Sequence, residues 1–328
     1  MKNKLSYLWI CLLMGLFPSC TTVQIASFER LQPASVSFPE QIRRVGVVNA
    51  MPVVQHANLE KGYSVNVLEG DGVLTTDALA REIAATDYFD RVVICDSAIW
   101  QKSLPMQEPL SAVKVDSLSR MLDVDMLLVM ERVHVQLAEG IMVIPGLMNT
   151  VSSIDGVVTP LLRAYVPGRN APLFSISKSD TICWEKGPDL TMGQILKDAS
   201  EYAATMPMEK LLPYWMEVQR YYFDGGNVEM RDAGVYVRES NWADAGLLWK
   251  QVYDTKKGMA KMRAAFNLAL YHEVQDDLEQ AQAYLNEAIG LVSEGSPEYV
   301  VADFYRRQLD EQIKQNQQLR MQMQRFER

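Results

Sequence analysis

The histidines and their neighbours are the first residues to consider for catalysis or metal binding. The chain contains three, His56, His134 and His272. His272 and Glu273 begin a His-Glu-x-x-His pattern, in which two histidines one helical turn apart bind zinc, but Asp276 stands where the second histidine belongs. The zinc motif is therefore incomplete, and we expect His272 to pack against its neighbours.

Two groups of acidic residues offer a weaker signal. The run from Glu69 to Gly72 could hold a cation, although Glu-Gly-Asp-Gly is also typical of a plain turn. Asp123 and Asp125 flank the start of a predicted strand, where they face either a cleft or solvent. The chain has no Gly-x-Ser-x-Gly elbow, no phosphate-binding loop and no dinucleotide fingerprint. We therefore predict no catalytic residue, no metal site and no cofactor.

Residues 1–22 have the features of a targeting segment. Two lysines precede an apolar run from Leu5 to Phe17, and Pro18 and Ser19 lead to Cys20, which is the order of a secretory signal. The run is shorter than the roughly 20 residues that a spanning helix needs. A cysteine after a small residue resembles the lipobox of bacterial lipoproteins, although Phe17 and Pro18 depart from the usual residues there. The resemblance implies a signal peptide over residues 1–19 and a mature chain whose Cys20 carries acyl chains such as palmitate; an uncleaved membrane helix is the alternative.

The net charge of −9 gives the protein an acidic surface. Phosphate binding depends on clustered lysine and arginine, so neither nucleic acid nor a polybasic membrane contact is expected. Of the four cysteines, Cys95 and Cys183 remain once the signal and the lipidated residue are set aside. One disulfide and two buried thiols both fit these positions, and the thiols are favoured because each residue lies at the edge of a predicted strand.

Residues 41–186 alternate between strand and helix patterns. Five segments have the composition and length of strands: 43–49, 91–95, 125–136, 157–166 and 173–184. Amphipathic helices over residues 75–86 and 113–122 separate the first three strands, which favours parallel pairing with right-handed crossovers. The last two strands are expected to form a hairpin, and residues 140–156 a loop. We predict an α/β sandwich-like domain of about five strands and two helices, preceded by a lipidated tether over residues 20–40.

The sequence pattern of this region is similar to that of a known group of proteins. RRVGVVNA, ATDYFDRVVICD and SLSRMLDVDMLLVMERV repeat a plan in which a strand leads to a helix and the helix to the next apolar strand. The plan resembles the small α/β domain of envelope lipoproteins of the curli-secretion-channel-like and penicillin-binding-protein-activator-like group. The resemblance implies envelope assembly or partner binding, and it assigns no residue a role.

From residue 187 the sequence predicts helices throughout, including one that runs from Pro207 to Phe223. Ala233 and Ala245 are followed 36 residues later by alanines at 269 and 281, and Trp249 by a leucine at 285. The arrangement is similar to tetratricopeptide repeats, whose period is about 34 residues, although the usual early Trp, Gly and closing Pro are missing. We predict an all-α tetratricopeptide-like domain over residues 187–328, whose last helix ends in a frayed tail.

Aromatic residues gather in this helical part. Tyr221, Tyr222, Trp242, Trp249 and Tyr253 are candidates for a groove that binds a peptide or a glycan, because Trp and Tyr are frequent anchors of interfaces. Their spacing also fits packing between helices.

These features predict a multidomain α+β/α lipoprotein of the bacterial outer membrane that faces the periplasm. It would be a non-enzymatic scaffold for a protein or peptide of the cell envelope. The alternative is a hydrolase or glycan-processing accessory with acidic residues in the α/β cleft. That alternative requires two converging carboxylates, one of them with a raised pKa.

Overall fold

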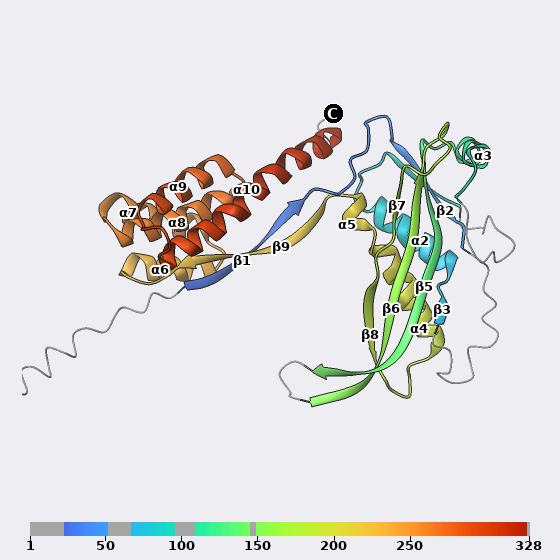
Figure 1. Cartoon of the computed structure of the whole chain (residues 1–328), viewed down its shortest axis with the longest axis horizontal. Coiled ribbons are helices and arrows are strands. Elements are labelled where there is room, and N and C mark those ends of the chain that lie inside the picture. Colours follow the sequence, from blue (N-terminus) through green and yellow to red (C-terminus); the bar gives the residue numbers. More distant parts are fainter. Residues whose placement is uncertain (1–22, 52–66, 96–108, 145–148, 327–328) are drawn as a thin grey trace, which may run out of the picture. The chain divides into compact units, whose positions relative to one another are not determined.

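The structure is a computed structural model, and it describes residues 23–51, 67–95, 109–144 and 149–326 (Figure 1). A strand-rich N-terminal region is followed by C-terminal helices, so the fold is mixed α/β. The chain divides into two compact units. We call Pro33–Tyr214 with Leu319–Arg328 the α/β unit, and Met1–Gln32 with Trp215–Gln318 the helical unit.

Three parallel strands form one half of the sheet in the α/β unit. Strand β2 (Arg44–Asn49) lies between β4 (Arg91–Cys95) and β5 (Met126–Ile144) and runs parallel to both. The connecting helices are α2 (Gly72–Ala84) and α3 (Ala112–Leu122), which pack into two separate apolar clusters with alternate residues of the sheet. The predicted strand-helix-strand-helix-strand order is therefore confirmed.

The second half of the sheet is antiparallel. Strand β6 (Asn149–Tyr165) pairs with β5 over its whole length, and three short strands complete the sheet: β3 (Val67–Glu69) on β5, and β7 (Phe174–Ile176) and β8 (Asp180–Glu185) on β6. The loop predicted over residues 140–156 is wrong, because hydrogen bonds between β5 and β6 continue to the pair Ile144 and Asn149. The prediction of about five strands was also too low, since the sheet has seven in the described residues.

Helix α4 (Met192–Thr205) belongs to the α/β unit, so the boundary expected at residue 187 lies inside that unit. Its small buried residues, Ala199 and Ala203 among them, pack against the sheet and α2. The Asp71 N–H donates to the Ser200 hydroxyl at 2.8 Å and thereby links the start of α2 to α4. The short helix α5 (Met208–Leu211) follows.

The helix predicted through residue 223 is a strand. β9 (Tyr214–Phe223) pairs with β1 (Val23–Gln32) in a two-stranded ribbon, so about half of the tether predicted over residues 20–40 is a strand. Residues 218, 220 and 222 of β9 are buried and their neighbours 217, 219 and 221 are exposed, which is the period-2 pattern of a strand packed on one face. Asn267 fastens the end of β9, because its side chain accepts from the Phe223 N–H at 2.9 Å and donates to the Phe223 carbonyl at 2.7 Å.

Five helices complete the helical unit: α6 (Val228–Arg238), α7 (Trp242–Thr255), α8 (Met259–Val274), α9 (Leu278–Gly290) and most of α10 (Pro297–Met323). The turns before α7 and α9 have the same geometry 36 residues apart. Ser240 and Asp276 have positive φ angles of 58° and 59°, and the N-caps that follow, Asn241 and Asp277, share φ −88° and ψ 72°. The alanines of the repeated pattern and both large residues, Trp249 and Leu285, are fully buried.

Residues 319–326 pack against the rest of the α/β unit. Helix α10 continues to Met323, and a 3₁₀ turn covers Gln324–Phe326. The buried side-chain amide of Gln322 accepts from the Ala34 N–H and donates to the Ala34 carbonyl, both at 2.9 Å. The frayed tail was therefore a wrong prediction, because these polar residues bind backbone groups that lie far away in the sequence.

Candidate interaction site

The five predicted partner-binding aromatics do not form one surface. Trp249 and Tyr222 lie in the core of the helical unit, with ring centroids 6.4 Å apart. Trp242 is partly buried and packs edge-on against Phe28 at 6.2 Å. These three side chains are occupied by packing inside their own unit.

Tyr253 and Tyr221 differ from the other three. The Tyr253 hydroxyl donates to the Glu287 carboxylate, and this hydrogen bond raises the pKa of Tyr253 to about 12. The Lys261 ammonium lies 4.5 Å from the Tyr253 ring centroid. Tyr221 is the most accessible of the five, with 43% of its surface exposed on the outward face of β9.

The acidic residues proposed for a cation or a cleft have structural roles. The Asp71 carboxylate caps α2 by accepting from the N–H groups of residues 73 and 74, and Glu69 pairs with Arg132 at 2.7 Å. Arg44 pairs with Asp125 at 2.8 Å and also with Asp123, whose pKa is lowered by hydrogen bonds from Arg91 and Arg44. No group of three possible metal ligands occurs among the described residues.

One acidic residue that the sequence did not single out is Glu131, which is buried at the β5 bulge. Burial raises the pKa of Glu131, while its carboxylate accepts from the Tyr165 hydroxyl at 2.8 Å and pairs with Arg163. Its described partners are thus a hydroxyl and a guanidinium, not a second carboxylate. In the described part of the chain, Glu131 does not provide the converging pair that the hydrolase alternative requires.

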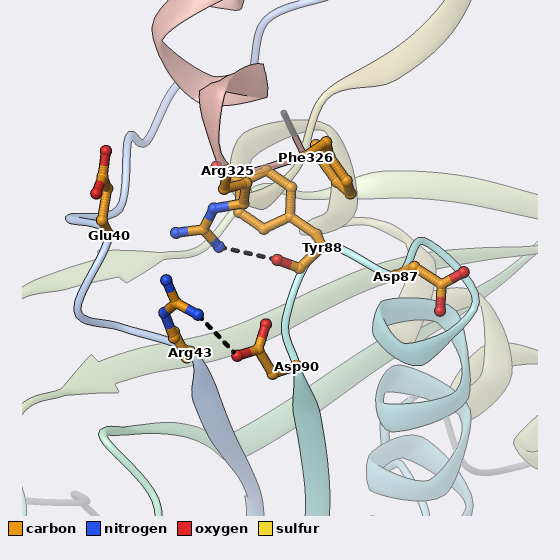
Figure 2. Close-up of a pocket in the computed structure, with 7 residues that line it drawn as sticks. All are labelled: Glu40, Arg43, Asp87, Tyr88, Asp90, Arg325 and Phe326. Carbon is orange, nitrogen blue, oxygen red and sulfur yellow. Dashed lines mark hydrogen bonds and ion pairs between the residues drawn. The ribbon is translucent and has the colours of Figure 1, made fainter. Parts of the chain in front are cut away.

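A small cavity of about 50 Å³ lies where the C-terminal segment meets the rest of the α/β unit, and Figure 2 shows the residues that line it. Ligand pockets usually measure about 300–1,000 Å³, so this cavity is too small for a substrate. The Arg325 guanidinium lies over the Tyr88 ring, 4.1 Å from its centroid, and donates to the Tyr88 carbonyl at 2.9 Å. Arg43 and Asp90 form an ion pair at 3.4 Å beside them. We interpret the contacts of Arg325 around this cavity as those that hold the C-terminal segment in place.

Arg325→Ala is expected to lower the free energy of unfolding by about 2 kcal/mol, the sum of a partly desolvated cation–π contact and a charged hydrogen bond. Arg325→Lys should lose less, because an ammonium keeps the charge over Tyr88. Urea titration gives the free energies, and limited proteolysis reports release of the C-terminal segment. Equal stability of Arg325→Ala and the unmodified protein would contradict this role.

The end of the β5–β6 hairpin, which we call the arm (described residues 137–144 and 149–152), exposes apolar side chains to solvent. Ile141 and Val143 are 74% and 63% exposed, and they lie opposite Ser152 and Thr150 on β6. Residues 140–154 contain no charged side chain, whereas Glu139 and Asp155 stand at either side. In Figure 1 the described strands of the arm bend to the left at the lower end of the sheet and extend beyond it.

Among the described residues, the arm also has an open edge on its β5 side. Strand β3 pairs with β5 only over residues 134–136, so in the described part of the chain no third strand pairs with β5 beyond Gln136. On the other side of the arm, β8 reaches Ser153 of β6, and the Lys186 N–H donates to the Ser152 carbonyl. An edge strand presents a row of backbone donors and acceptors to any further strand. The arm therefore combines exposed apolar side chains with a strand edge that no other described strand pairs with.

The described residues define a mixed α/β protein with a seven-stranded sheet and a helical unit. Residues 42–223 match the family model described as a domain of unknown function, DUF8603, and because this is more than half of the chain, the protein belongs to that family. Residues 231–311 match a second model, the domain of unknown function DUF6340. No characterised protein matches the chain in sequence. Within the described residues, no helix has both the length and the apolar composition required to cross a bilayer.

Proposed function

We propose that the protein is an envelope lipoprotein of the outer membrane, anchored through Cys20, that serves as a non-enzymatic adaptor for a protein partner in the periplasm. The order of the N-terminal residues supports the anchor, although Cys20 lies outside the described residues. The structural roles of Asp71, Asp123 and Asp125 support an adaptor over an enzyme, because these carboxylates are held in ion pairs or a helix cap.

The helix pairs α6/α7 and α8/α9 are similar to tetratricopeptide repeats in this proposal. Their support is the shared turn geometry of Ser240-Asn241 and Asp276-Asp277, 36 residues apart. The small buried alanines of each pair let the two helices approach closely, and Trp249 or Leu285 fills the next layer. Repeats of this kind stack into a rigid platform, which suits a scaffold.

The observation that carries the partner assignment is the open edge of β5 in the arm. A strand of a second protein can complete its backbone hydrogen bonds, while Ile141 and Val143 pack against apolar side chains of the same partner. Lipid cannot pair with exposed N–H and C=O groups, and open sheet edges do not occur in the hydrocarbon region. A protein strand therefore fits this edge better than a bilayer does.

A double substitution tests the arm. Ile141→Glu with Val143→Glu should weaken partner binding about tenfold or more, since an unpaired carboxylate would be buried at the interface. A photoreactive residue at Leu137, on the same edge, reports binding in the native envelope as a discrete protein adduct that the double variant loses. Val113→Glu, an exposed apolar position on α3, is the matched control and should keep the adduct. An adduct that survives the double substitution would refute the arm as the binding edge.

Cys20→Ser tests the anchor separately. Without the sulfur no acyl chain can be attached, so the variant should leave the membrane fraction and appear in the soluble periplasm. A variant that still sediments with membranes would contradict lipid anchoring at this residue.

A further inference from the structure

The β1–β9 ribbon has one face packed on the helices and one face turned to solvent. On β1 the even-numbered residues include Ala26, which is buried, whereas Val23 and Ile25 are 41% and 58% exposed. On β9 the exposed series ends in Tyr221. Figure 1 shows the start of β1 beside the end of β9, so these three exposed side chains gather at the same end of the ribbon. We call them the ribbon-end patch.

The distance to the proposed anchor is short. Only residues 21 and 22 stand between Cys20 and Val23. An extended chain spans at most about 3.6 Å per residue, so the Val23 Cα lies no more than about 11 Å from the Cα of Cys20. The headgroup layer on one side of a bilayer is about 5–8 Å deep. A lipidated Cys20 would thus hold the start of β1 at the membrane surface.

We propose that the ribbon-end patch, Val23, Ile25 and Tyr221, rests in the headgroup region of the bilayer. This inference rests on the proposed lipid anchor. Valine and isoleucine lose exposed apolar surface there, and tyrosine places an apolar ring and a polar hydroxyl at the interface, where it is enriched in membrane proteins.

The rest of the same face limits the contact to this end. Between this end and the exposed Trp215 near the start of β9, the outward face carries polar or acidic residues: Ser27 and Glu29 on β1, and Glu217 and Gln219 on β9. These side chains favour water over the bilayer. No lysine or arginine lies on the outward face, so the contact needs no anionic lipid and should form on neutral phosphatidylcholine.

The test installs the anchor chemically, so that it does not depend on processing in the cell. A chain that begins at Cys20 and carries Cys95→Ser and Cys183→Ser is coupled through Cys20 to a maleimide phospholipid in phosphatidylcholine vesicles. A photoreactive benzoylphenylalanine replaces Ile25 in one sample and Leu247, an exposed residue on α7 of the same unit, in the other. Mass spectrometry then measures phospholipid adducts at each position.

We expect several-fold more phospholipid adduct at residue 25 than at residue 247. Equal yields at the two positions would show that the unit has no fixed face on the bilayer and would overturn the proposal. Adducts from residue 25 to a second copy of the chain would overturn it as well, in favour of self-association. Because the lipid is attached in vitro, failure here leaves the Cys20 anchor standing, and failure of the Cys20→Ser fractionation leaves this result standing.

Discussion

Glu273→Ala is expected to lower the free energy of unfolding of the helical unit by about 3–5 kcal/mol, because it leaves a buried arginine without a counter-charge. Glu273 on α8 is fully buried and holds Arg220 of β9 through two hydrogen bonds of 2.7 and 3.0 Å. Its carboxylate also accepts from the Tyr305 hydroxyl of α10 at 2.6 Å. One carboxylate therefore joins the ribbon to two helices.

Urea denaturation followed by circular dichroism measures this loss. Glu279→Ala, an exposed residue on α9, is the matched control and should change stability by less than about 0.5 kcal/mol. Arg220→Ala combined with Glu273→Ala should be more stable than the sum of the two single losses predicts, because the double variant no longer buries an unpaired Arg220 guanidinium. Arg30, 3.9 Å from Glu273, loses its counter-charge in the double variant as it does in Glu273→Ala. Simple additivity of the single losses would contradict the buried pair as the cause.

Trp249→Ala should cost about 3–5 kcal/mol of unfolding free energy, since it empties the centre of the helical core. Trp249 has no exposed surface and packs beside Tyr222. Its indole Nε1 is buried and has no hydrogen-bond partner in the described part of the chain. Trp249→Phe removes that nitrogen and keeps most of the ring, so it should cost much less than the alanine variant.

The same pair of variants separates packing from partner binding. Thermal unfolding of Trp249→Ala, Trp249→Phe and the exposed control Leu247→Ala ranks their stabilities, and partner capture is measured beside it. We expect capture by Trp249→Phe to equal that of the unmodified protein. Loss of capture with unchanged stability would show that Trp249 takes part in partner binding.

The parallel part of the α/β unit could be predicted because its signals are local. Strands β2, β4 and β5 begin as short apolar runs, and the helices between them have a clear apolar stripe. Strand β9 could not be predicted in the same way. The burial of Arg220 in this strand depends on Glu273, which lies 53 residues further along the chain. No local sequence pattern therefore indicates the strand.

The candidate site also depends on contacts between distant residues, which the sequence alone does not show. The aromatic residue types chosen from the sequence serve a core as well as an interface, and only the tertiary contacts place Trp249 inside and Tyr221 outside. The arm was missed because Pro145 and Gly146 suggested that the whole segment was a loop. Its strands are defined by pairing across the hairpin, which the order of residues alone does not show.

The hydrogen bonds between Gln322 and Ala34 can form only late in the synthesis of the chain. The two residues are 288 positions apart, so a ribosome must make the whole stretch from Ala34 to Gln322 before this bond can form. Until then the α/β unit lacks its final segment, while residues 215–318 have already left the tunnel. Premature termination near residue 318 would therefore yield a product that contains all the described strands but lacks the segment that binds Ala34.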